Sequence, residues 1–235
     1  MKTLKRTIPF NWNFPLKSLI VLSLAVIFLA SCKNDDDDLP QPDLAALNVV
    51  NASPGQTAFN FALDNQIVNG PALTFTDQTG YLSAYSGSRK FDVTLGGTTQ
   101  TVLTDTLNLE TDKYYSIFIT GQTPLSTLLT EDDLTAPATG KAKIRFIQLS
   151  PDGGSLALGI KGGAELFPAQ AFRTASEFIS VDPGEHVLEL SNSGGTALTE
   201  TNLTVTAGKM YTIWAGGLLA GTGDAAILLH VDPIN

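Results

Sequence analysis

An internal repeat of about 97 residues limits the folds open to this 235-residue chain. Three pairs of landmarks keep nearly the same spacing: Ser53-Pro54 with Ser150-Pro151, Gly87 with Gly184, and Tyr115 with Tyr211. Solenoid repeats have much shorter periods of roughly 20–50 residues. The longer period therefore predicts two separate domains of similar fold.

Within each copy, apolar side chains recur at every second position. Residues 91–95 show this alternation in the first copy and residues 156–160 show it in the second. Such a period, interrupted by turn residues, is typical of half-buried β-strands. The sequence predicts an all-β fold of two tandem antiparallel β-sandwich (immunoglobulin-like) domains at 46–133 and 143–235, joined by a linker at 134–142.

Tyr115 and Tyr211 each follow a tight turn and open a late strand of their copy. The tyrosine corner of immunoglobulin-like sandwiches occupies this place, with its hydroxyl bonded to upstream backbone. An ordinary core tyrosine is the alternative. In either case we predict that the two tyrosines are structural.

Residues 1–31 contain four basic residues and no acidic one, and residues 18–30 form an apolar run. A basic start followed by a short apolar run is typical of a secretory signal peptide. A helix needs about 20 apolar residues to cross a bilayer, and this run has 13. We therefore predict a signal peptide at 1–31 rather than a transmembrane anchor.

The signal peptide is followed by the single cysteine, Cys32, which excludes an intrachain disulfide and a cysteine-based zinc site. Leu29-Ala30-Ser31-Cys32 resembles the lipobox of bacterial lipoproteins. The resemblance implies cleavage before Cys32 and acylation of its sulfur and its new amino group. Several acyl chains would hold the protein firmly on a membrane, since one chain binds only marginally. A buried free thiol is the alternative, which the acidic run that follows disfavours.

An acidic segment follows Cys32 directly and continues into a proline-containing tether, predicted to span 32–45. The segment consists of Lys33, Asn34, Asp35, Asp36, Asp37 and Asp38. It resembles the export signal of Bacteroidetes-type surface lipoproteins, which implies a place on the outer face of the outer membrane. A solvated acidic spacer is an alternative. A calcium site is a further one, although adjacent aspartates on a tether offer no preformed cage.

The charge balance excludes one class of partner. The chain has 14 Lys+Arg against 23 Asp+Glu, a net charge of −9, and without residues 1–31 the net charge becomes −13. Nucleic-acid binding needs a basic surface, so no nucleic-acid partner is expected. An acidic protein is also repelled by an anionic membrane surface, so lipid rather than charge would hold it there.

The repeated landmarks together resemble the domain-of-unknown-function 4397 family. They are the Ser-Pro pair after a first strand, the glycine turn before a β-run, and the tyrosine that opens a late strand. The resemblance covers about 47–133 and 144–235. It implies a secreted or surface protein, frequently with the domain in tandem, and an immunoglobulin-like build. It implies no activity.

The residues that could carry chemistry are few. His186 and His230 lack the spacing of a metal site or a catalytic pair, and we expect both to face solvent. Glycoside hydrolysis needs two carboxylates across a cleft, for which Asp92, Glu185 and Glu189 are candidates, although acids on strands are commonly only solvated. No catalytic residue, cofactor or metal ligand is predicted, and the enzyme classes are disfavoured.

These observations favour a non-enzymatic outer-membrane lipoprotein, exposed on the cell surface, that presents two β-sandwich modules for binding or adhesion. Its partner could be a glycan or an envelope protein. Tyr81, Tyr85 and Trp214 are the nearest candidates for an aromatic surface that stacks on sugar, although their positions in strands favour the core. The alternative is a surface glycan-processing hydrolase, or an accessory subunit of one, with a site between the domains. A mere spacer is a third reading.

Overall fold

The computed structural model describes residues 42–55 and 57–234. The predicted signal peptide, Cys32 and the acidic segment at 33–38 therefore lie outside the described residues. The remainder belongs to one compact unit, Pro42–Asn235. In its described part, no helix has the length and hydrophobicity of a membrane-spanning segment.

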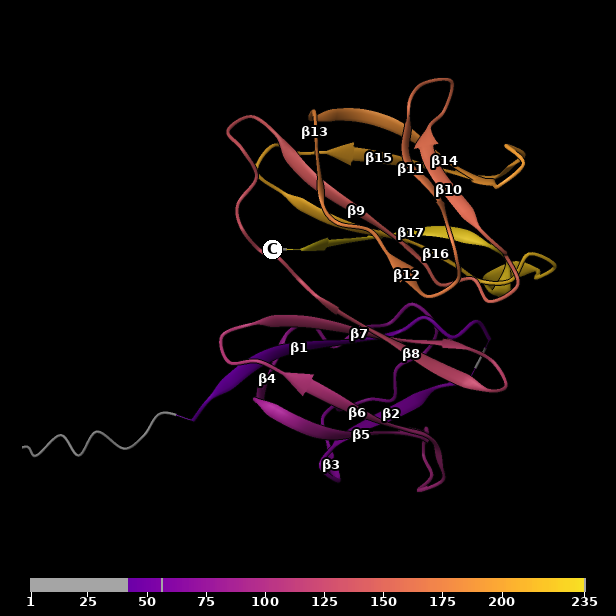
Figure 1. Cartoon of the computed structure of the whole chain (residues 1–235). Helices are drawn as coiled ribbons and strands as arrows, with labels where there is room; N and C mark the ends of the chain where they lie inside the picture. Colours follow the sequence, from indigo (N-terminus) through magenta and orange to yellow (C-terminus); the bar gives the residue numbers. More distant parts are fainter. Residues whose placement is uncertain (1–41, 56, 235) are drawn as a thin grey trace, which may run out of the picture. The chain divides into compact units, whose positions relative to one another are not determined.

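Nearly all of the regular structure is β-strand, as predicted (Figure 1). The first half contains β1 (Leu44–Asn51), β2 (Phe59–Leu63), β3 (Gln66–Ile67), β4 (Leu82–Tyr85), β5 (Gly87–Leu95), β6 (Thr101–Leu109), β7 (Tyr114–Gly121) and β8 (Leu125–Glu131). The second half contains β9 (Ala142–Gln148), β10 (Leu156–Ile160), β11 (Glu165–Gln170), β12 (Thr174–Ala175), β13 (Ile179–Val181), β14 (Gly184–Asn192), β15 (Ala197–Val205), β16 (Met210–Gly216), the 3₁₀ helix η2 (Gly223–Ala225) and β17 (Leu228–Ile234).

The two halves have the same strand order. In the first half, an inner sheet β4-β1-β7-β8 faces an outer sheet β3-β2-β5-β6. In the second half, the inner sheet is β12-β9-β16-β17, with β13 also paired to β9, and the outer sheet is β11-β10-β14-β15. Each half is thus a β-sandwich. Most pairs are antiparallel as predicted, but β1–β7 and β9–β16 are parallel, because the intervening chain crosses to the outer sheet and returns to the same end.

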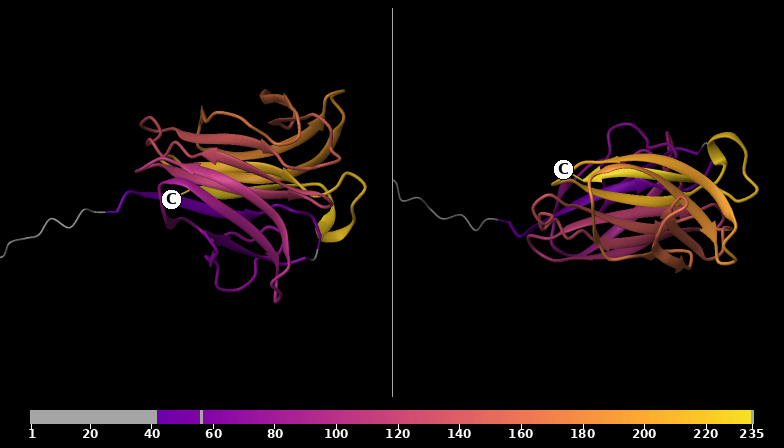
Figure 2. Two further views of the ribbon diagram at one scale, coloured as in Figure 1. Left: turned by 60° about the horizontal axis from the view of Figure 1, so that its bottom comes forward. Right: turned by 90° about the horizontal axis from the view of Figure 1, so that it is seen from above.

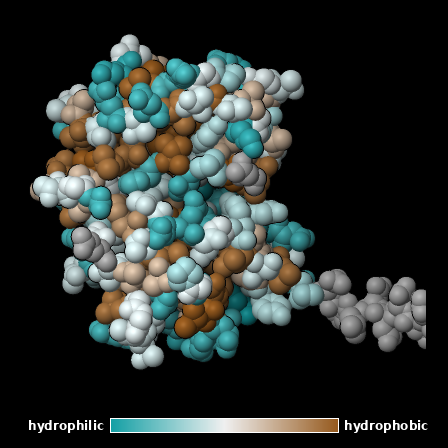
Figure 3. Space-filling model, turned by 180° about the vertical axis from the view of Figure 1, so that it is seen from behind, coloured by the Kyte–Doolittle hydropathy of each residue, from teal (hydrophilic) through white to brown (hydrophobic). Residues whose placement is uncertain are grey.

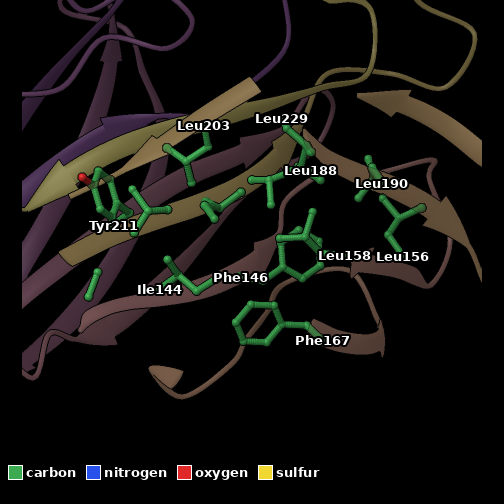
Figure 4. Packing of buried hydrophobic residues seen from close by; sticks show 14 of the residues in the cluster. Ile144, Phe146, Leu156, Leu158, Phe167, Leu188, Leu190, Leu203, Tyr211 and Leu229 are labelled. Carbon is green, nitrogen blue, oxygen red and sulfur yellow. The ribbon is translucent and has the colours of Figure 1, made fainter. Parts of the chain in front are cut away.

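A separate hydrophobic core fills each sandwich. In the second, side chains at alternate strand positions point from the two sheets toward one another (Figure 4). Phe146 from β9 and Phe167 from β11 pack at a ring-centroid distance of 6.1 Å. In the first, Phe61 and Phe91 stack at 5.9 Å. The period-two pattern of the sequence therefore marks the residues that the two sheets of each half share.

A third hydrophobic cluster joins the inner sheets of the two halves, which lie next to each other in Figure 1 and in the left view of Figure 2. It consists of Val50, Ala52, Phe118, Ile147, Leu149 and Trp214, all at most 1% exposed. The Thr120 hydroxyl also donates a hydrogen bond of 2.7 Å to the carbonyl of Leu149. The central strands of the inner sheets are therefore buried on both faces over most of their length, which explains why they are more continuously apolar than the outer strands.

A buried ion pair connects the first half to the second. Asp132 directly follows β8, and its Oδ1 lies 2.6 Å from Nη2 of Arg145 in β9, with side-chain exposures of 0% and 3%. Arg145 also donates from Nε to Thr212 at 2.9 Å, and its guanidinium lies 4.9 Å from the ring centre of Phe178. The segment between β8 and β9 covers residues 132–141, whereas the sequence predicts a linker at 134–142.

The Ser-Pro landmarks have the same structural role in both halves. Asn51 Oδ1 accepts a hydrogen bond from the Ser53 amide at 3.0 Å, and Gln148 Oε1 accepts one from the Ser150 amide at 2.7 Å. The two serine hydroxyls donate to the carbonyls of glycines that end β7 and follow β16, at 2.6 and 2.8 Å. The repeated motif therefore fixes the end of the first strand against the end of its parallel neighbour.

Tyr115 and Tyr211 also make equivalent contacts. Each lies in the core of its sandwich, and each hydroxyl accepts a hydrogen bond from a backbone amide five residues upstream. The donors are Glu110 at 3.2 Å and Thr206 at 3.0 Å. This is the contact that defines a tyrosine corner.

Candidate functional site: the tyrosine face and the polar pocket

Two exposed tyrosines lie on one face of the first inner sheet. Tyr85 in β4 pairs with Leu44, and Tyr114 in β7 pairs with Ala46 on the other side of β1. Leu44 and Ala46 are two positions apart, so their partners project to the same face. Tyr85 is 62% exposed and Tyr114 is 42% exposed.

A third tyrosine, Tyr81, lies beside them and completes what we call the tyrosine face (Tyr81, Tyr85 and Tyr114). Its ring meets that of Tyr114 edge to face at 5.3 Å, and its hydroxyl donates to Oδ2 of Asp132 at 2.7 Å. Burial and the Asp132 carboxylate raise the pKa of Tyr81 well above its usual value. Tyr81 therefore remains protonated, and its donor is fully used by Asp132.

Next to Tyr81 is a cavity of about 300 Å³, which we call the polar pocket. Its walls come from both halves of the protein. They are formed by Asn48, Gln78, Gly80, Tyr81, Ser116, Phe118, Thr212, Asp232, Pro233 and Ile234. Most of its polar groups are hydroxyls, amides and one carboxylate, and one wall is aromatic.

Asn48 is a buried residue of this pocket with an incomplete set of partners. It is 8% exposed, and its Nδ2 lies 2.9 Å from Gln78 Oε1, to which it donates. Its Oδ1 is buried without a hydrogen-bond partner among the described residues. Buried polar atoms are rarely left unpaired, so each such atom calls for an explanation.

Asp232, in β17, supplies the carboxylate. Its Oδ2 accepts a hydrogen bond of 2.8 Å from Nε1 of Trp214. Burial raises the pKa of Asp232 above its usual value, and the Trp214 hydrogen bond offsets part of that rise. The nearby Asp132 is compensated by Arg145, so the uncompensated acidity of the pocket comes from Asp232.

The sequence marks these residues only in part. Tyr81 and Tyr85 are predicted as aromatic candidates, and they lie on the same face of the first inner sheet, where the ring that Tyr81 contacts is that of Tyr114. Trp214 is fully buried between the halves and does not reach the surface. Tyr114, Asn48 and Asp232 are missed, although Tyr114 could have been found, because it precedes the core residue Tyr115 and must point to the opposite face.

A second and larger cavity, the loop groove, opens at one end of the interface between the halves. It has a volume of about 810 Å³ and is lined by Gly55, Thr74, Phe75, Thr76, Thr222, Gly223, Asp224, Ala225, Leu228 and His230. In Figure 2 the loop between β16 and β17 (yellow) lies beside the loop that follows β1 (indigo). Loops from both halves therefore form this groove.

The sequence predicts that His230 faces solvent, but the structure shows it half-buried beside the loop groove. Its ring stacks on Trp214 at a centroid distance of 4.0 Å and meets the edge of Phe75 at 5.5 Å. Burial lowers the pKa of His230 to about 4, so the imidazole is neutral near pH 7. His230 alternates with Leu229 and Val231 along β17 and therefore projects to the opposite face of the strand. Phe75 of the first half covers part of that face.

The other titratable candidates are separate from both cavities. Asp92 accepts hydrogen bonds of 2.6 Å from Lys90 and from Thr104, which hold its pKa below the usual value. Glu185 and Glu189 lie in β14 of the second outer sheet. His186 Nε2 lies 3.1 Å from the carbonyl of Asp182, at a turn. The structure does not bring these candidates together into one site.

A third cavity, of about 350 Å³, does gather carboxylates. Glu131, Asp133 and Glu177 line it beside Arg145. Hydrogen bonds from Thr135 and the Lys143 charge lower the pKa of Asp133 to about 2. A glycosidase acid needs a raised pKa, so this carboxylate is unsuited to that role. Over 42–55 and 57–234, no group of three His, Cys, Asp or Glu side chains is arranged to hold a metal ion.

Comparison with known proteins places a family domain on part of the chain. Residues 45–159 contain a domain of the family described as Domain of unknown function (DUF4397). This span begins in β1 and ends in β10, so it includes the first half and the start of the second. No curated protein matches the chain.

Two solved structures are similar at a distance. One is CBMbc (family CBM26) from Eubacterium rectale Amy13K in complex with maltoheptaose, with 11% identity over 80% of this chain and 96% of that one, and a TM-score of 0.26. The other is the Bacillus anthracis TIE protein, with 8% identity over 73% of this chain and 33% of that one, and a TM-score of 0.24. These likenesses are too distant to assign a ligand or an activity to this chain.

Proposed function

We propose that this protein is a non-catalytic binding module that recognises a glycan through the tyrosine face and the polar pocket. Tyr85 and Tyr114 expose large ring surfaces on one sheet face, and the pocket beside them offers amide, hydroxyl and carboxylate groups. Ligand sites commonly combine apolar and aromatic surface with a few polar groups that orient the ligand. Sugars have an apolar ring face and polar hydroxyls, which this combination fits.

The exposed pair Tyr85 and Tyr114, on the sheet face that also bears Tyr81 of the pocket wall, is the observation that carries the proposal. The strands that position them are anchored by the core of the first sandwich and by the cluster between the inner sheets, so the face is preorganised. On the side shown in Figure 3, hydrophobic residues gather mainly over the second half, with a smaller group over the first.

A glycan array with the whole mature chain, carrying Cys32→Ala for solubility, tests this function. We expect retention on a subset of glycans and a loss of roughly tenfold or more in affinity for Tyr114→Ala, since tenfold corresponds to about 1.4 kcal/mol. Ile67→Ala is the matched control, because Ile67 is 67% exposed but lies in the outer sheet. Equal binding by Tyr114→Ala and Ile67→Ala would contradict the proposed face.

We further propose that the module is tethered to the outer face of a bacterial outer membrane by lipid at Cys32. The lipobox-like sequence and the following acidic segment support this localisation. Mass spectrometry of the membrane fraction should find an acylated Cys32 as the first residue, and Cys32→Ala should release the protein from membranes. Protease added to intact cells should remove the protein. Resistance to protease in cells that retain an acylated Cys32 would place the anchor on the periplasmic side instead.

A further inference from the structure

We propose that the sugar unit held in the polar pocket carries a positively charged amino group, placed between Asp232 and Asn48 Oδ1. This inference rests on the proposed glycan-binding function and names the ligand class more narrowly. It follows from the hydrogen-bonding groups that the pocket leaves unused and from the charges around it.

Two hydroxyl donors of the pocket wall are committed elsewhere. The Tyr81 hydroxyl donates to Asp132 at 2.7 Å, and the Ser116 hydroxyl donates to the same carboxylate at 2.6 Å. The buried atom of the wall without a partner is an acceptor, Asn48 Oδ1. A ligand that donates hydrogen bonds would therefore complete the pocket. An ammonium group has three donors and no acceptor.

The charges of the site agree with a cation. Arg145 and Asp132 compensate each other at 2.6 Å, which leaves the Asp232 carboxylate as the net charge of the pocket. A hydrogen bond between an ammonium and a carboxylate is charge-assisted and stronger than a neutral one. The tyrosine rings next to the pocket would also attract a cation. The chain as a whole is acidic, with a net charge of −9, which favours the approach of a cationic ligand.

A neutral sugar fits these groups less well. Its hydroxyls could satisfy Asn48 Oδ1, but they would leave the Asp232 carboxylate in a half-buried place without an opposite charge. A carboxylate taken out of water is costly unless it is paired. The pocket should therefore discriminate between sugars that differ only in the substituent at one carbon, and should prefer the charged amino group.

Titration calorimetry with three matched β-1,4-linked hexasaccharides tests the inference: one of glucosamine, one of N-acetylglucosamine and one of glucose. The protein is the whole mature chain with Cys32→Ala. We expect the glucosamine hexamer to bind at least tenfold more tightly than the other two. Asp232→Asn should remove this preference, because an asparagine oxygen still accepts the Trp214 hydrogen bond but carries no charge.

Asp224→Asn is the matched control, because it removes the same charge from an exposed residue of the loop groove. It should retain the preference for glucosamine. If Asp232→Asn retains that preference too, the attraction comes from the overall charge and the inference is wrong. If the three hexamers bind wild type equally, the inference is wrong while glycan binding stands. If none binds and the array is also empty, the proposed function itself fails.

Discussion

Equivalent positions of the two inner sheets have taken different roles. Asn48 in β1 corresponds to Arg145 in β9, and each pairs with a hydroxyl residue of the parallel strand, Ser116 or Thr212. Arg145 is held by Asp132, Thr212 and the Phe178 ring, so it serves the contact between the halves. Asn48 lines a cavity, and its buried oxygen is unpaired. One fold thus supplies an interface in one copy and a pocket wall in the other.

The neighbouring positions differ in the same way. Tyr114 opens β7 and is 42% exposed, whereas the residue that opens β16, Met210, is 5% exposed. Leu134, Ala136 and Pro137 of the connecting segment form a small cavity with Met210. The segment that joins the halves therefore covers the second copy of this face and leaves the first copy open, which is why we place the binding face on the first half.

The largest expected effect is a difference in the free energy of unfolding between a variant that breaks the Arg145 ion pair and a variant that alters the Asn48 pocket wall. Asp132→Ala should lower the free energy of unfolding by about 3–5 kcal/mol, since it leaves the buried Arg145 charge without its partner. Asn48→Ala should change it by about 1 kcal/mol or less, because it removes weak contacts together with an unpaired acceptor. Urea denaturation of both variants measures the difference.

The double variant Asp132→Leu with Arg145→Met is the control for this contrast. Replacing a buried ion pair by apolar groups of similar size is often neutral for stability. Recovery of most of the lost stability would show that the cost comes from the uncompensated charge. If Asn48→Ala lowers the free energy of unfolding as much as Asp132→Ala does, the equivalent positions Asn48 and Arg145 do not differ in role.

The sequence predicts the parts of this contrast that depend on local pattern. Alternation marks the strands, and the repeated tyrosines and Ser-Pro pairs mark equivalent corners and strand ends. It does not predict that the inner sheets pack on each other, because alternation reports that a face is buried and not by what. His230 shows the consequence, since it was expected outward and is covered by Trp214 and Phe75 from the two halves. The pocket is missed for the same reason, because Asn48 and Asp232 meet only through that interface.

A smaller effect on the free energy of unfolding is expected when the pH is lowered, because His230 lies at the same interface. His230 lies opposite Trp214 in the β16–β17 pair, where the first half has Leu128 opposite Phe118. Burial lowers the pKa of His230 to about 4, so the folded state favours the neutral ring. The unfolded chain protonates near pH 6.5, and stability is therefore complete above pH 6.5 and falls on the order of 2 kcal/mol as the pH drops toward 4.

His230→Leu isolates this contribution, because it gives the second half the residue found in the first. Its stability between pH 6.5 and 4 should be flatter than that of the wild type in urea titrations at each pH. Asp232, whose pKa is raised, contributes in the opposite direction over the acidic end of this range and is present in both proteins. A wild-type curve parallel to that of His230→Leu would mean that His230 is not held neutral by the interface.

The smallest effect is expected where the two halves are most alike. Tyr115→Phe and Tyr211→Phe each remove one hydrogen bond, from the Glu110 amide and from the Thr206 amide, and leave the ring in its core. Each should lower the free energy of unfolding by about 1 kcal/mol. The double variant should show the sum, because the two corners lie in separate cores and share no contact. Thermal and urea unfolding give the three values. A much larger loss for one of the two single variants would mean that the equivalent tyrosine corners differ in their contribution to stability. The contrast between the halves would then extend beyond the interface and the tyrosine face.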